Sequence, residues 1–137
     1  MAHTLKLEIV TPDSKVFSGD VEMVTLPGIE GEMGIYPQHV PLMTQLVPGE
    51  VVARQAGRDL FLAVGEGFVE ITGDHVNIIT DMAIEAENID EAKAEEARRR
   101  AEARLAQQIS DEEAAAVRAM LARATVQVQV KRRRAGK

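Results

Sequence analysis

The sequence of 137 residues contains no cysteine and no tryptophan, and only three phenylalanines and one tyrosine. Without cysteine, the chain cannot form disulfides, a thiolate nucleophile or a cysteine-ligated zinc site. The same absence fits a reducing compartment. Since aromatic residues are so few, we expect a core built from aliphatic side chains.

Long apolar segments are also missing. The first ten residues, MAHTLKLEIV, have neither the basic start nor the long apolar stretch of a secretory signal. No apolar run approaches the roughly 18 residues that a membrane-spanning helix requires. We therefore expect no direct insertion into a membrane, so that any membrane association would depend on a partner.

Patterns typical of enzymes are absent as well. His3, His39 and His75 are too scattered to give the paired spacing of metal ligands on one element. Gly65-Glu66-Gly67 has the glycine spacing of a dinucleotide-binding loop, but the strand-like FVEIT follows it, so no helix N-terminus is available for a pyrophosphate. A hairpin turn is the better interpretation. The sequence therefore predicts no catalytic residue, no metal site and no required cofactor.

The charges are distributed unevenly. Residues 1–86 contain 4 Lys and Arg against 13 Asp and Glu, whereas residues 87–137 contain 12 against 9. The last seven residues, KRRRAGK, carry five bases and no acid. An acidic body with a basic arm suggests that the arm meets an acidic surface, although a solvated, frayed tail accounts for the composition equally well. Nucleic-acid binding is not expected, because the arm is short and has no interleaved aromatic residues.

Residues 4–84 alternate apolar and polar side chains and are punctuated by turns. Short strands joined by short turns predict an antiparallel meander that closes into a sandwich or flattened barrel. A second strand is expected over residues 15–27, with a break at Ser18-Gly19. We assign residues 1–86 to an antiparallel β-sandwich domain in a chain of the α+β class.

The least regular stretch is residues 27–41, which contains three glycines and three prolines. These residues exclude a helix and leave room only for short edge strands. A loop of this length in a small domain is usually functional or disordered. Its apolar side chains, such as Ile29, Met33 and Ile35, favour an ordered loop that binds a partner.

Residues 87–137 are predicted to form an antiparallel helical hairpin with a basic tail. Asn88 and Ser110 are each followed three positions later by Glu, the signature of a helix N-terminus. Because an alanine methyl buries little apolar area, we expect the hairpin to be held weakly and to have more than one docking position. The two stripes of mostly small residues are Ala94, Ala97, Ala101 and Leu105, then Ala114, Val117, Leu121 and Ala124.

The segment 125–130, TVQVQV, does not suit a helix. It is β-branched and strictly alternating, so we expect the second helix to fray after Ala124 or to depend on its context. A segment that is undecided between two states is a natural switch.

Several cations lie on the two predicted helices. If the hairpin folds back on itself, Lys93 and the arginines at 98–100 could converge with Arg118 and Arg123 and hold phosphates. The spacing favours the alternative, in which these cations are solvated and pair with glutamates three or four residues away.

Two stretches carry a resemblance to a known family. GEMGIYPQHVPLMTQLVPGEV, from Gly31 to Val51, and AVGEGFVEITGDHVNIITDMAIEAENIDEAKAEEARRRAEARL, from Ala63 to Leu105, resemble the epsilon subunit of bacterial F-type ATP synthases. The similarity extends over essentially the whole chain. It implies a sandwich of about ten strands followed by two antiparallel helices. It also implies a non-catalytic subunit that joins gamma at the foot of the central stalk, rests on the c-ring and rotates during proton-driven ATP synthesis.

The resemblance further implies sites and a location. The loop formed by Glu30, Gly31, Glu32 and Met33 would lie toward the c-ring, and His39 would touch gamma. The C-terminal helices would open, insert among the alpha and beta subunits and inhibit ATP hydrolysis. Since the sequence shows no transit peptide, we expect a bacterial protein, peripheral on the cytoplasmic face of the inner membrane. The cations proposed to contact the catalytic subunits are Arg118, Arg123, Lys131, Arg132, Arg133 and Arg134.

Some members of this family bind ATP on the closed hairpin through an Ile/Leu-Asp-x-x-Arg-Ala motif and later arginines. Lys93 replaces the motif arginine here, and Gln127 falls where tight-binding members have an arginine. Because a lysine lacks the bidentate fork of an arginine, ATP binding is expected to be weak or absent. The positions that do match are Ile89, Asp90, Ala94, Arg100 and Arg123.

Three functions remain open at this point. The first is a non-catalytic rotor subunit that couples rotation to ATP synthesis and regulates hydrolysis. The second is a nucleotide-sensing module in which ATP stabilises the closed hairpin by mass action. The third is a free-standing adaptor whose sandwich binds peptides at an edge strand.

Overall fold

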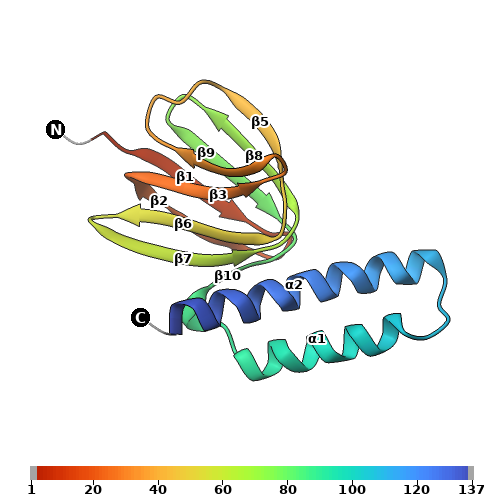
Figure 1. Ribbon diagram of the computed structural model, residues 1–137. Coiled ribbons are helices and arrows are strands. Elements are labelled where there is room, and N and C mark those ends of the chain that lie inside the picture. Colours follow the sequence, from red (N-terminus) through yellow and green to blue (C-terminus); the bar gives the residue numbers. More distant parts are fainter. Residues whose placement is uncertain (1–2, 136–137) are drawn as a thin grey trace.

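The structure, a computed structural model, describes residues 3–135. Ten strands form an N-terminal β-sandwich, and a short 3-10 turn leads into two antiparallel helices (Figure 1). The predicted α+β architecture is therefore confirmed. The elements are β1 (Leu5–Val10), β2 (Lys15–Val21), β3 (Met23–Gly28), β4 (Gly31–Ile35), β5 (Leu42–Leu46), β6 (Gly49–Gln55), β7 (Arg58–Val64), β8 (Gly67–Thr72), β9 (His75–Thr80), β10 (Ala83–Glu85), the 3-10 turn η1 (Ala86–Asn88), α1 (Glu91–Leu105) and α2 (Asp111–Ala135).

The sheet is continuous but folds into two layers. Its strand order is β10-β7-β6-β3-β5-β8-β9-β1-β2, with β4 paired to β3. β3 and β5 share the single pair Gly28–Leu46, and this corner separates the layer of β10, β7, β6 and β3 from the layer that begins at β5. Neighbouring strands are antiparallel except for β1 and β9, which run parallel. A parallel pair requires a long connection, and here the chain from β2 to β8 supplies it.

The break between the second and third strands lies at Glu22, so the predicted break at Ser18-Gly19 is wrong. Gly19 continues the ladder opposite Leu7. At Glu22 the chain exchanges β1 for β6 as its partner, and the Glu22 amide donates to the Arg54 carbonyl at 2.7 Å. The strand therefore ends where the chain passes from one layer to the other, which alternation of side chains alone does not reveal.

The core between the two layers is aliphatic, as predicted. Alternate residues of each strand point inward, and in β1 the side chains of Leu5, Leu7 and Ile9 are 1 %, 0 % and 0 % exposed. Burying a leucine or isoleucine in this way contributes about 1.5–3 kcal/mol. Among the residues that the structure describes, this main core contains strand side chains only. The sandwich therefore has a core to which the helices do not contribute.

Both helices begin at a capped residue. Asp90, rather than the predicted Asn88, caps α1: its carboxylate accepts a hydrogen bond from the Lys93 amide at 3.1 Å, while Asn88 lies in η1. Ser110 caps α2 as predicted, since the Glu113 amide donates to its hydroxyl at 3.1 Å. An N-cap of this kind contributes about 1 kcal/mol, so the start of each helix is well defined.

α2 continues through residues 125–130 and ends at Ala135, so the predicted fraying does not occur. Val126 and Val130, one turn apart, are 7 % and 2 % exposed and pack in one cluster with Ala63 of the sandwich. The helix propensity of valine is lower than that of alanine by less than about 1 kcal/mol. Tertiary packing therefore outweighs the unfavourable propensity of this segment.

α2 lies between the sandwich and α1 (Figure 1). It packs against β7, β6 and η1 on one side and against α1 on the other. Ala94 and Ala124, one from each predicted stripe, are buried and line the same cleft between the two helices. The alanine stripes thus join the helices to each other, whereas the contact with the sandwich depends on the valines and on charged residues of α2.

Candidate functional site

The last turn of α2 is fixed to the sandwich by one carboxylate. Glu50, on β6, accepts hydrogen bonds from Arg134 Nε at 2.8 Å, from Arg134 Nη2 at 2.6 Å and from Arg133 Nη1 at 2.9 Å. The side chain of Glu50 is only 10 % exposed. The Arg134 guanidinium carbon also lies 3.8 Å from the centroid of the Phe61 ring. A bidentate, charge-assisted pair of this kind is stronger than a neutral hydrogen bond.

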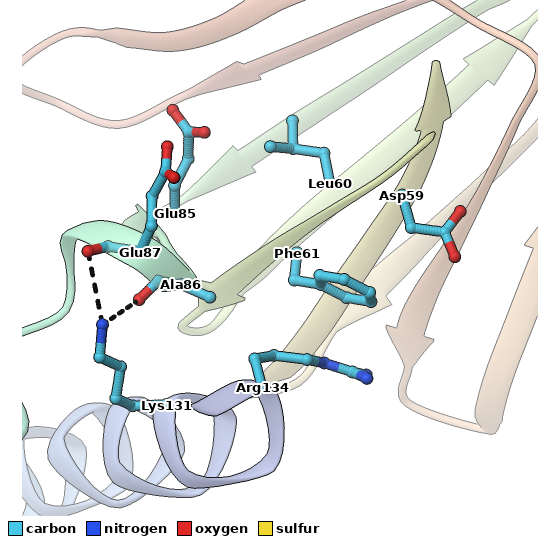
Figure 2. Close-up of a pocket in the computed structure, with 8 residues that line it drawn as sticks. All are labelled: Asp59, Leu60, Phe61, Glu85, Ala86, Glu87, Lys131 and Arg134. Carbon is cyan, nitrogen blue, oxygen red and sulfur yellow. Dashed lines mark hydrogen bonds between the residues drawn. The ribbon is translucent and has the colours of Figure 1, made fainter. Parts of the chain in front are cut away.

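A pocket of about 350 Å³ lies beside this contact (Figure 2). Lys131 reaches it from α2, and its Nζ donates to the carbonyl oxygens of Ala86 at 3.1 Å and Glu87 at 3.4 Å. Because Ala86 and Glu87 belong to η1, Lys131 ties the end of the hairpin to the link from which the hairpin starts. The pocket is lined by Asp59, Leu60, Phe61, Glu85, Ala86, Glu87, Lys131 and Arg134.

Arg123 makes a second contact with the sandwich, half-way along α2. Its Nη1 lies 3.1 Å from Asp81 Oδ2. This pair lies over Gly65, where a Cβ atom would be 1.9 Å from Asp81 Oδ1 and 3.5 Å from Arg123 Cγ. The segment 65–67 is not the predicted hairpin turn, because it connects β7 of one layer to β8 of the other. The absence of a side chain at Gly65 gives Asp81 and α2 room to meet, a role that glycine spacing does not indicate.

The remaining predicted cations are Arg132 and Arg118. Arg132 binds α1 instead of the sandwich, with Nε 2.6 Å from Glu91 Oε2 and Nη2 3.4 Å from Glu95 Oε2. Arg118 is exposed on α2. The basic arm therefore meets acidic groups of its own chain and is helical as far as it is described, while Gly136 and Lys137 lie outside the described residues.

The predicted nucleotide residues are only partly brought together. A cleft of about 270 Å³ between the helices is lined by Lys93, Ala94 and Arg123, together with Gln127. The other three have different surroundings. Asp90 caps α1, Ile89 is buried in the cluster beneath α2, and Arg100 pairs with Glu96 on the outside of α1.

The predicted c-ring loop is the tip of the β3–β4 hairpin. Glu30, Gly31 and Glu32 are exposed there, and Met33 is half-buried. Gly31 has a φ of 127°, which favours glycine at the turn. His39 lies in the loop before β5, and the Gln38 amide in this loop donates to Asp74 Oδ1 at 2.8 Å. This hydrogen bond ties the loop to the β8–β9 turn, so the loop is ordered, as predicted.

An apolar patch, missed by the sequence analysis, covers the layer opposite α2. It consists of Met43 on β5, Phe68 on β8 and Ile79 on β9, which are 67 %, 57 % and 52 % exposed. Phe68 pairs directly with Ile79 across two neighbouring strands. We call these three residues the outer patch. Large apolar side chains gathered on one exposed face are typical of an interaction surface, and the order of the strands in the sheet, not in the sequence, brings them together.

Two ion pairs shift the titration of their members. The hydrogen bond with Glu50 raises the pKa of Arg134. On α1, the hydrogen bond from Arg98 lowers the pKa of the Glu95 carboxyl, and Arg132 acts in the same direction. The Glu50–Arg134 pair joins α2 to the sandwich, the Arg98–Glu95 pair lies within α1, and Arg132 connects Glu95 to α2.

Residues 3–135 contain no group of three histidine or acidic side chains that could hold a metal ion. Neither helix, as far as the structure describes them, combines the length and the hydropathy needed to cross a bilayer.

Models of known families match residues 4–132, from β1 almost to the end of α2. Residues 4–86 match the ATP synthase delta/epsilon chain, beta-sandwich domain, and residues 87–132 match the ATP synthase delta/epsilon chain, long alpha-helix domain. The chain belongs to the ATP synthase delta/epsilon chain family. Arg133 and Arg134, which bind Glu50, lie beyond the matched residues.

Individual proteins similar to this chain are ATP synthase epsilon chains. The ATP synthase epsilon chain of Dehalococcoides mccartyi is 46 % identical over 131 residues, covering 95 % of this chain and 94 % of that protein. The ATP synthase epsilon chain of Herminiimonas arsenicoxydans is 42 % identical over 130 residues, covering 93 % of each. The resemblance to epsilon subunits is therefore confirmed, and the chain is a non-catalytic subunit of an ATP synthase.

Chains in two solved ATP synthase assemblies share the fold. A chain in the mitochondrial ATP synthase of Euglena gracilis, described as OSCP, F1 and c-ring, superposes with a TM-score of 0.74 at 24 % identity, covering 90 % of this chain and 78 % of that one. A chain in the central stalk and c-ring of the Tetrahymena thermophila mitochondrial ATP synthase gives 0.62 at 15 % identity, covering 94 % and 96 %.

Proposed function

We propose that this family member is a rotor subunit of the central stalk, which couples proton-driven rotation to ATP synthesis and inhibits ATP hydrolysis through its helices. The proteins of the same fold from Euglena and Tetrahymena belong to assemblies that contain a c-ring, and the second is described as a central stalk. The complex would hold the subunit peripherally on the cytoplasmic face of a bacterial membrane.

In this proposal, the sandwich binds the stalk through the outer patch. Covering Met43, Phe68 and Ile79 with gamma would remove apolar surface from water, at roughly 25 cal/mol per Å². The tip from Glu30 to Met33 would face the c-ring, and His39 would touch gamma. Phe68→Glu should abolish co-purification with gamma, because it places a charge in the patch. Met120→Glu, at a 53 % exposed position of α2, is the matched control and should retain gamma. Retention of gamma by Phe68→Glu would count against this surface.

The proposed inhibition of ATP hydrolysis is supported by the separation of two apolar clusters. Within the described residues, the main core is built from strands alone, and α2 docks on a second, smaller cluster that includes Ala63, Val126 and Val130. The sandwich can therefore keep its core when α2 leaves. The cations freed from the sandwich and from α1, together with Arg118, would then meet acidic surfaces of the alpha and beta subunits.

A truncation tests this inhibitory role. Removal of residues 106–137 takes away α2 and leaves the strands of the main core untouched. In the assembled enzyme we expect normal incorporation of the truncated subunit and an increased rate of ATP hydrolysis. An unchanged rate with normal incorporation would refute inhibition by the helices.

The cleft between the helices supports a second, weaker candidate function, the sensing of ATP. Lys93 and Arg123 both line it and could hold phosphates, but Gln127 supplies no charge there. We propose that native binding is too weak to detect and that two arginines would restore it. Calorimetry with millimolar Mg-ATP should give no heat with the native chain and measurable heat with Lys93→Arg/Gln127→Arg. Strong binding by the native chain would instead favour nucleotide sensing.

A further inference from the structure

We propose that Glu50, Arg133, Arg134 and Phe61 form a latch whose charge determines how readily α2 leaves the sandwich. We call this group the Glu50 latch. The proposal rests on the proposed inhibitory function, in which the hairpin opens, and adds to it the residues that hold the hairpin closed.

The position of Glu50 makes its ion pairs depend on α2. Glu50 lies opposite Ala63 on the neighbouring strand, and Ala63 belongs to the cluster on which α2 docks. Val51, the next residue along β6, is buried in the main core, so Glu50 points to the other face. A carboxylate that is 10 % exposed must be paired, because burial of an unpaired charge is costly. Arg133 and Arg134 of α2 provide the pairing.

The same burial makes the latch reversible. When α2 leaves, Glu50 and Arg134 return to water, whereas Arg133 is already 52 % exposed, so much of the energy lost with the ion pairs is regained as hydration. Arg134 lines the pocket of about 350 Å³ (Figure 2) and is 21 % exposed, so water already reaches its side chain while α2 is docked. Leucine side chains gain no comparable hydration energy when an apolar contact between them opens. The junction is therefore built differently from the main core.

The apolar part of the junction is small, so the charged part matters. The buried members of the docking cluster are no larger than isoleucine, and its larger side chains, Phe61 and Met82, are only partly buried. The buried members are Ala63, Ala86, Ile89, Val126 and Val130. Arg134 adds its contact with the Phe61 ring to the bidentate pair with Glu50. Both arginines lie beyond residue 132, where the match to the helical domain of the family ends.

Glu50 and the two arginines can be separated experimentally. Arg133 and Arg134 are among the cations proposed to contact the catalytic subunits, so removing them weakens both the closed and the inhibitory state. Glu50 belongs to the sandwich and takes part in the closed state only. Glu50→Gln is therefore the substitution that isolates the latch.

The experiment uses the full-length chain with two introduced cysteines, Thr72→Cys on β8 and Ala116→Cys on α2, both at exposed positions. Since the chain has no native cysteine, spin labels attach only there. A urea titration of the distance between the labels gives the equilibrium constant for closing. Loss of the charged hydrogen bonds in Glu50→Gln should lower this constant about tenfold. Arg133→Ala/Arg134→Ala should lower it similarly, and Asp13→Asn, which removes a carboxylate from an exposed turn, should leave it unchanged.

The NMR methyl signals of the main core check that the sandwich of each variant is folded. An unchanged constant in folded Glu50→Gln, or separation of the labels only when the sandwich itself unfolds, would overturn the proposal. ATP hydrolysis by the assembled enzyme then distinguishes the latch from the inhibitory function. If Glu50→Gln opens the hairpin but does not lower hydrolysis, the latch stands and inhibition fails. If truncation at residue 106 raises hydrolysis but Glu50→Gln leaves the closing constant unchanged, inhibition stands and the latch is wrong.

Discussion

The sandwich and the hairpin of this chain are held together in different ways. The sandwich buries leucine, isoleucine and valine side chains to 0–1 % exposure between two layers of strands. The hairpin uses alanine between its helices and, against the sandwich, a small valine cluster surrounded by ion pairs. The first arrangement favours one cooperative structure, while the second can be undone piecewise. The difference suits a subunit in which one region stays attached and the other moves.

The largest expected effect breaks the sandwich. Leu62→Ala removes a fully buried side chain from the main core, and such a substitution costs about 3 kcal/mol of the free energy of unfolding. Urea denaturation followed by the NMR methyl signals of the main core measures it. Leu105→Ala, at a half-buried position of α1, is the control and should leave unfolding of the sandwich unchanged. A loss of equal size in both variants would mean that the two regions unfold as one unit.

A smaller effect is expected at the valine cluster. Val130→Ala removes two methyl groups from a 2 % exposed side chain, a loss of roughly 1.6 kcal/mol at 0.8 kcal/mol per group. The higher helix propensity of alanine offsets up to about 0.7 kcal/mol of this loss. We therefore expect closing of the hairpin to weaken by about 1 kcal/mol, measured by the urea titration of the label distance. Gln129→Ala, at the exposed neighbouring position, should not weaken it.

A third substitution acts on the second contact of α2. In Gly65→Ala the new methyl would overlap Asp81 and displace it from Arg123. A partly exposed pair of this kind contributes about 0.5 kcal/mol, so the closing constant should fall about twofold. Asp81→Asn, which weakens the pair without adding a methyl, should have a similar effect. If Gly65→Ala unfolds the sandwich as well, the glycine serves the strand connection more than the docking of α2.

The smallest effect on the hairpin is expected when the pH is lowered. The hydrogen bond from Arg98 lowers the pKa of the Glu95 carboxyl from its ordinary value of 4.5. The stability that the ionised carboxylate contributes is therefore complete above about pH 4.5, and it is lost as the pH falls through the lower pKa of the folded protein. Glu95 also receives Arg132, which links α1 to the end of α2. Acidification should therefore loosen the hairpin before the apolar core. In Glu95→Gln, this part of the pH dependence of the label distance should disappear.

The sequence predicted those features that depend on local pattern. Alternation identified the strands, Ser110 identified the start of α2, and the residues around Glu30 were recognised as an ordered loop. Features that depend on partners in space were missed. The parallel pairing of β1 with β9 and the change of layer at Glu22 follow from topology, which a local pattern does not encode.

The same distinction applies to the candidate site. TVQVQV has a poor local preference for helix, and it is helical because Val126 and Val130 pack in one cluster with Ala63. Glu50 and Arg134 lie 84 positions apart, so no motif could pair them. The outer patch likewise forms only when β5, β8 and β9 are placed side by side.

The most direct test of the account compares two transitions in one urea titration of the native-sequence chain carrying labels at positions 72 and 116. The distance between the labels reports the hairpin, and the NMR methyl signals of Leu5, Leu7 and Ile9 in the main core report the sandwich. We predict that the labels separate at a lower urea concentration than the one at which the strands are lost. Coincident transitions would contradict the account, because the hairpin and the sandwich would then form a single cooperative unit.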